Sequence, residues 1–136
     1  MKAANIKRVF IPGSKWVYYK VYAGLNTADT ILTDKIGPLG DQLIKDGVID
    51  KWFFIRYSDP ENHLRIRFHL KDEKLIESVI KGVYHAFESH INNQLIWDLQ
   101  LATYQRELER YGTNTIEDLE SFFHHDSEVL LDIIKT

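Results

Sequence analysis

The chain has 136 residues, of which 44% are hydrophobic and 27% charged, so we expect a single globular domain spanning residues 1–136. It contains no cysteine, which excludes disulfides and thiolate zinc sites. The formal net charge of −3 argues against nucleic-acid binding by the chain as a whole. No apolar run is long enough to cross a membrane, and no apolar segment of signal-peptide length follows the N-terminus. We therefore expect a cytoplasmic protein.

The first half of the chain predicts a strand followed by helical structure. Residues 15–23 are rich in β-branched and aromatic side chains, which is typical of a strand. Apolar residues then recur at helical spacing over 31–43. Gly37-Pro38 interrupts this pattern, so we expect a kink or two short helices, and Gly47 is a suitable residue to end the second one.

The rest of the chain predicts a hairpin, a long helix, a strand and a final helical region. Residues 52–57 and 63–70 predict the two strands of the hairpin, joined by turn-forming residues. Residues 74–92 carry the clearest helical stripe of apolar side chains. Residues 95–106 alternate again as a strand, and 116–134 predict one or more helices.

This order of elements is β-α-β-β-α-β followed by helix, which is the order of a ferredoxin-like α+β fold. Such a fold has a four-stranded antiparallel sheet with both crossover helices on one face. Because side chains alternate along a strand, Leu64, Ile66 and Phe68 should face the helices. The residues between them should then face away, on a sheet face that the helices leave uncovered.

The uncovered face is predicted to gather cationic and polar side chains from several strands. Arg65 and Arg67 lie on it by alternation, together with His63. The residues expected to complete it are Lys20, Arg56, Tyr104 and Arg106.

Two interpretations of this face remain open. It is either a solvated sheet face with cross-strand ion pairs, or a site for carboxylate or phosphate groups, which the planar fork of arginine binds with two parallel hydrogen bonds. His63 is the best general-base candidate in the chain because imidazole titrates near neutral pH, but a structural or turn-stabilising role is the favoured interpretation of this residue. The sequence contains no glycine-rich phosphate loop and no spaced metal-ligand motif, so no cofactor and no metal are predicted.

Six segments, in this order along the chain, resemble the C-terminal domain of class I lantibiotic dehydratases, also called the thiopeptide-type bacteriocin biosynthesis domain. These segments are 10–16 (FIPGSKW), 19–22 (YKVY), 53–60 (FFIRYSDP), 63–68 (HLRIRF), 104–112 (YQRELERYG) and 123–127 (FHHDS). Together they span nearly the whole chain, so the combination is specific.

The resemblance implies a lyase-type chemistry in the maturation of a ribosomally made peptide. In this family a separate domain uses glutamyl-tRNA to esterify serine or threonine, and the domain that this chain resembles eliminates glutamate to leave a dehydroamino acid. Some relatives instead form the pyridine ring of thiopeptides by cycloaddition. The family's functional arginines match Arg65, Arg67 and Arg106, while Arg56, Tyr104 and Lys20 are expected to bind substrate.

The resemblance covers only the N-terminal half of the family domain. The family assigns proton transfer partly to a histidine further along, so the chain is expected to be a fragment, a short standalone form or half of a split enzyme. The first hypothesis is therefore an elimination domain in which Arg65, Arg67, Arg106 and His63 are catalytic. The alternative is a non-catalytic module that binds the precursor peptide or a partner enzyme, and the open sheet face also suits a homodimer. A third hypothesis, RNA stacked on aromatic side chains, lacks the RNP-type sequence.

Overall fold

The computed structural model describes residues 7–58, 61–106 and 115–135. Its centre is a four-stranded antiparallel sheet with the strand order β3-β4-β2-β5. The strands are β2 (Trp16–Ala23), β3 (Ile49–Tyr57), β4 (His63–Leu70) and β5 (Ile96–Ala102). Along the chain, helical segments connect β2 to β3 and β4 to β5, so the predicted α+β class with an antiparallel sheet is confirmed.

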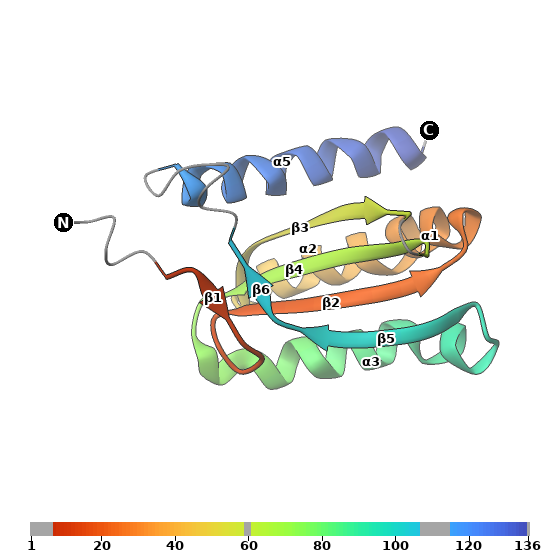
Figure 1. The fold of residues 1–136 in the computed structure, drawn as a ribbon, viewed down its shortest axis with the longest axis horizontal. Helices are drawn as coiled ribbons and strands as arrows, with labels where there is room; N and C mark the ends of the chain where they lie inside the picture. Colours follow the sequence, from red (N-terminus) through yellow and green to blue (C-terminus); the bar gives the residue numbers. More distant parts are fainter. Residues whose placement is uncertain (1–6, 59–60, 107–114, 136) are drawn as a thin grey trace.

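The helical segments that connect the strands pack on one face of this sheet (Figure 1). Between β2 and β3 the chain forms α1 (Leu25–Ile31), a π-helical segment (Leu32–Ile36) and α2 (Gly37–Lys45). The predicted interruption near Gly37-Pro38 is thus a change of helical type, because Pro38 lies in the first turn of α2. Gly47 follows α2 with a φ of 74°, the left-handed conformation for which glycine is suited.

The second connection begins with a 3₁₀ turn (Glu73–Leu75) and continues as α3 (Ile76–Asn92). The C-terminal region forms one uninterrupted helix, α5 (Ile116–Lys135). No helix in the described part of the chain is both long and apolar enough to span a bilayer.

The predicted fourth strand differs from the observed one. It divides into β5 and a short β6 (Tyr104–Gln105), and β6 pairs with β1 (Val9–Phe10) in a separate two-stranded sheet. The ring of Tyr104 stacks on that of Phe10 with centroids 6.0 Å apart. This small sheet therefore carries the chain over one end of the larger sheet (Figure 1).

The main core lies between the four-stranded sheet and α1–α3. Leu64, Ile66, Phe68 and Leu70 of β4 are at most 1% exposed and belong to it, as their alternation predicts. A smaller aromatic cluster lies on the opposite face of the sheet. Its members are Phe10, Trp16, Tyr18, Phe53 and Tyr104, with Phe123 of α5 packed against them.

Helix α5 covers the edge of the sheet formed by β3 (Figure 1). The backbone N–H of Phe54 donates a hydrogen bond to Ser127 Oγ at 3.1 Å. His124 Nδ1 contacts the carbonyl oxygen of Trp52 at 2.8 Å. Side chains of α5 thus satisfy backbone groups that an exposed edge strand would leave unpaired.

Candidate functional site

The strand register aligns residues in cross-strand rows on the outer face, the face of the sheet opposite α1–α3, and three of these rows hold the predicted cations of β4 and β2 together with His63. Each row contains one residue of β4 flanked by one residue of β2 and one of β3. The rows are Tyr18, Arg67 and Phe53; then Lys20, Arg65 and Ile55; then Tyr22, His63 and Tyr57. The predicted placement of Lys20, His63, Arg65 and Arg67 on one face is therefore correct.

One end of the outer face, here called the closed end, is covered by β1, β6 and α5, and the other end is called the open end. Arg67 is enclosed by aromatic rings at the closed end, and only 9% of the residue is exposed. Its guanidinium carbon lies 4.6 Å from the ring centre of Tyr18, 4.7 Å from that of Tyr104 and 5.4 Å from that of Phe53. Cation–π contacts within about 6 Å are attractive, but they use no N–H donor.

The aromatic rings attract the charge of Arg67 but provide no strong acceptor for its N–H groups. Its Nε is buried and has no hydrogen-bond partner, and no ion pair joins Arg67 to a carboxylate within the described residues. Burying a charge without an opposite charge is costly. An unpaired donor on a nearly buried cation is therefore the feature of this face that most strongly indicates an anionic ligand.

Arg65 lies one row further toward the open end and is held by His63. Arg65 Nε donates to His63 Nε2 at 3.1 Å, which makes Nε2 an acceptor. The proton of the neutral imidazole is then on Nδ1, which donates to the carbonyl of Glu61 at 2.9 Å. The imidazole stacks between Tyr22 and Tyr57, and the guanidinium carbon of Arg65 lies 3.6 Å from the ring centre of Tyr57.

This geometry bears on the expected role of His63. Both ring nitrogens are engaged and the residue is only 4% exposed, so Nε2 accepts a substrate proton only if Arg65 releases it. His63 is well placed to orient Arg65. Lys20, which is directly opposite Arg65 on β2, adds a second partly exposed cation to the open end of the face.

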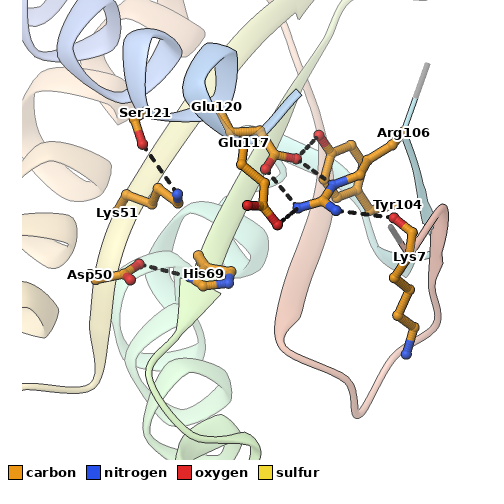
Figure 2. A network of polar contacts seen from close by, with 9 residues as sticks. All are labelled: Lys7, Asp50, Lys51, His69, Tyr104, Arg106, Glu117, Glu120 and Ser121. Carbon is orange, nitrogen blue, oxygen red and sulfur yellow. Dashed lines mark hydrogen bonds and ion pairs between the residues drawn. The ribbon is translucent and has the colours of Figure 1, made fainter. Parts of the chain in front are cut away.

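Arg106 has a different environment from the two arginines of β4 (Figure 2). Its Nε and Nη2 donate to the two carboxylate oxygens of Glu120 at 2.9 and 2.8 Å, and its Nη1 donates to the carbonyl of Lys7 at 3.0 Å. Arg106 is 6% exposed and Glu120 is fully buried. The guanidinium is thus saturated by a bidentate ion pair that ties β6 to α5. The prediction that Arg106 offers its fork to a ligand is corrected: the fork is committed to Glu120.

Tyr104 connects this ion pair to Arg67. Its hydroxyl donates to Glu120 at 2.6 Å, while the face of its ring contacts Arg67. Burial, followed by the neighbouring Glu120 carboxylate, holds the pKa of the Tyr104 phenol far above its ordinary value. Its hydroxyl is therefore neutral and already used, so Tyr104 contributes its ring rather than its hydroxyl to the site.

Arg56 does not join the outer face, contrary to the prediction. It forms an ion pair with Asp29 of α1, on the side of the sheet where the helices pack. In β3 the residues that alternate with Arg56, such as Ile55 and Tyr57, are those on the outer face.

Sequence reasoning missed Glu120, which organises the closed end of the face. A signal was present, because Ile116, Glu120, Ser127 and Leu131 lie on the buried side of α5 at helical spacing. A carboxylate on a stripe of buried residues indicates a buried partner. Within the described residues no three His, Asp or Glu side chains lie together in a way that could hold a metal ion.

Comparison with known proteins identifies the class to which this fold and face belong. Residues 16–136 match the family described as lantibiotic biosynthesis dehydratase, C-terminal region. The chain belongs to this family, as the sequence motifs indicated.

Individual relatives agree with this assignment. The chain is 30% identical over 131 residues to the subtilin biosynthesis protein SpaB of Bacillus subtilis, a match that covers 96% of this chain. It is 27% identical over 129 residues to the nisin biosynthesis protein NisB of Lactococcus lactis subsp. lactis, covering 94% of this chain. In both cases the chain spans 12% of the length of the relative.

Solved structures give the same result. The tRNA-dependent lantibiotic dehydratase MibB from Microbispora sp. 107891 superposes with a TM-score of 0.81 at 30% identity, over 93% of this chain and 12% of that one. TsrL superposes with a TM-score of 0.67 at 20% identity, over 88% of this chain and 34% of that one, which shows a shared fold.

Proposed function

We propose that this chain supplies the anion-binding part of a site that eliminates glutamate from glutamylated serine or threonine in a lantibiotic-type precursor peptide. Arg67 and Arg65 bind the free carboxylate of the glutamyl group and its ester carboxyl, which leaves as a second carboxylate, and Lys20 adds charge at the open end. The observation that carries the proposal is the nearly buried guanidinium of Arg67 with an unpartnered Nε beside three aromatic rings. The strand order supports a ferredoxin-like unit as the scaffold.

The proposed chemistry needs electrostatic stabilisation more than it needs a nucleophile. A base removes the Cα proton, the electron pair forms the Cα=Cβ double bond, and the Cβ–O bond breaks so that glutamate leaves as a carboxylate. Negative charge therefore develops on the ester oxygens and the leaving group. Fixed guanidinium groups stabilise that charge, and a key donor of this kind contributes roughly a hundredfold or more to the rate.

His63 is linked to this anion site through Arg65. When a ligand carboxylate accepts the hydrogen bond of Arg65 Nε, His63 Nε2 loses its donor and becomes able to accept a proton. Anion binding and the appearance of a base are then coupled. The engagement of both His63 nitrogens in the structure also favours a second candidate function, a module that binds the glutamylated peptide without turnover.

The test uses the 136-residue chain and a peptide that carries a glutamyl ester on serine. Arg67→Ala removes charged hydrogen bonds, which contribute about 1.5–3 kcal/mol each, so we expect peptide affinity to fall roughly tenfold to hundredfold. Arg56→Ala is the matched control, because Arg56 is an arginine of the same sheet that lies on the opposite face. Affinity should be measured by calorimetry, and glutamate release by an enzymatic assay.

The outcomes separate the two functions. Glutamate release that is lost in Arg67→Ala and kept in Arg56→Ala supports elimination. Binding without release, weakened only by Arg67→Ala, supports the binding module. Equal affinity of the wild-type chain and Arg67→Ala would remove the anion site on which both functions depend. Arg67→Lys is informative as well, because it keeps the charge but loses the planar fork.

A further inference from the structure

The two edges of the four-stranded sheet differ in whether another element covers them. α5 covers the β3 edge, whereas β5 at the other edge has β2 as its only neighbour among the described strands of this sheet. Alternate backbone N–H and C=O groups of β5 therefore point away from β2, and no described element covers them. An uncovered edge strand of seven residues is a template for pairing with another strand.

Exposed apolar side chains accompany this open edge on the helix side. Trp97 and Leu101 of β5 are 52% and 40% exposed, and Tyr84 and Ile80 of α3 are 53% and 39% exposed. A groove of 340 Å³ separates α3 from β5, which run beside each other along this side of the molecule (Figure 1). The apolar strip continues from the strand edge onto the helix, which is typical of an interaction surface.

The geometry points to a second copy of this chain as the occupant of this surface. Two β5 strands related by a twofold axis pair antiparallel, and opposite residues must lie on the same side of the sheet. The axis must then pass through one residue and its own copy. With Leu99 at the axis, Trp97 of one copy lies opposite Leu101 of the other, and Asp98 lies opposite Gln100. Each of these pairs occurs twice, once on either side of the axis.

This register is self-complementary, and neighbouring registers are worse. An axis at Asp98 would place two carboxylates opposite each other, and an axis at Gln100 would place Asp98 opposite Ala102. With the axis at Leu99, the Gln100 amide of each copy can donate to the Asp98 carboxylate of the other. The two groups suit each other, because Gln100 Nε2 donates to Asp98 Oδ2 at 2.7 Å within the chain itself.

The same twofold axis places α3 of both copies on one side of a continuous eight-stranded sheet. Tyr84, Ile80 and the half-exposed Ile91 of one α3 then approach those of the other. The pairing buries the apolar strip and satisfies the open backbone groups of β5 together. The inference is independent of the anion site, which lies on the outer face, and of the proposed reaction.

The absence of cysteine from the sequence allows a direct test of the register. In Leu99→Cys, the new thiol lies directly opposite its own copy at the axis, so mild oxidation should give a covalent dimer. In Leu101→Cys, the thiols of two copies lie four positions apart along the strands and should not join. A mixture of Trp97→Cys and Leu101→Cys chains should form the mixed dimer instead. Cross-linking of Leu101→Cys alone, equal to that of Leu99→Cys, would overturn the register.

The charge pattern provides a second test that leaves the core untouched. Gln100→Asp places a second carboxylate directly opposite Asp98 of the other copy in each half of the interface, so sedimentation velocity should show a dimer that weakens at least tenfold. Gln105→Asp is the matched control, because Gln105 is the exposed residue of β6, and it should leave the dimer unchanged. A wild-type chain that remains monomeric at about 1 mM has less than roughly 4 kcal/mol of association energy, which overturns the proposal. A monomer whose β5 amide signals shift on addition of an extended peptide also overturns it, in favour of a peptide at this edge.

Discussion

The buried ion pair between Arg106 and Glu120 should be a major source of stability, and Glu120→Gln tests this. The Glu120 carboxylate accepts three hydrogen bonds, from Arg106 Nε, Arg106 Nη2 and the Tyr104 hydroxyl, at 2.9, 2.8 and 2.6 Å. The amide removes the negative charge and turns one acceptor into a donor that faces donors. Breaking one side of a buried pair costs about 3–5 kcal/mol, because the other charge stays buried.

Urea unfolding followed by tryptophan fluorescence measures this loss. With an m value of about 1–3 kcal/mol/M for a small domain, the midpoint should fall by roughly 2 M. Glu117→Gln is the matched control, since Glu117 is 67% exposed and 3.9 Å from the same guanidinium. An exposed pair contributes at most about 1 kcal/mol.

A double variant separates the ion pair from other effects of Glu120. Glu120→Gln combined with Arg106→Met should be more stable than Glu120→Gln alone, because no uncompensated charge remains buried. If Glu120→Gln loses less than about 1 kcal/mol, the description of Arg106 as a committed structural clamp is wrong. Its guanidinium would then be available for a ligand.

Three further predictions concern the packing and titration of the fold. Gly40→Ala should destabilise the chain by about 1–3 kcal/mol in thermal unfolding, because a Cβ there overlaps the fully buried indole of Trp52 in β3. Gly24→Ala is the control and should not destabilise the chain, because the space around Gly24 is open. Ser127→Ala leaves the backbone N–H of Phe54 unpaired and should lower the free energy of unfolding by about 1–3 kcal/mol. Ser121→Ala removes only the hydrogen bond from the Lys51 side chain and should lower it by less than about 1 kcal/mol. The pKa of Tyr104 is raised on folding, so the unfolded chain loses this proton first and the free energy of unfolding should fall as pH rises above 10, by up to about 1.4 kcal/mol per pH unit. Tyr104→Phe should flatten this decline, and an unchanged slope between pH 10 and 11.5 would contradict the shift.

The sequence predicted the elements whose pattern is local. β4 alternates strictly between apolar and cationic residues, so the inward direction of Ile66 and the outward direction of Arg65 and Arg67 were both readable. β3 gives no such signal, because Trp52-Phe-Phe-Ile55 is apolar throughout. The side on which Arg56 lies therefore depended on its ion pair with α1, which no local pattern reveals.

The composition of the closed end could not be predicted for a similar reason. The rings around Arg67 come from three strands, and Glu120 reaches Arg106 from a helix 14 residues further along the chain. Each contact depends on tertiary packing that brings distant segments together. The sequence pattern therefore identified which arginines share a face, but it did not show that Arg106 already has a carboxylate partner.

The covering of β3 by α5 has a consequence for growth by strand addition. Filaments built by edge pairing need two accepting edges on every subunit, so that each added subunit offers a new end. Here the hydroxyl of Ser127 and the imidazole of His124 bind backbone groups of β3 and so block one of the two sheet edges. Lateral extension of this sheet must therefore stop after a single round, and variants that detach α5 are the ones in which open-ended polymerisation is expected.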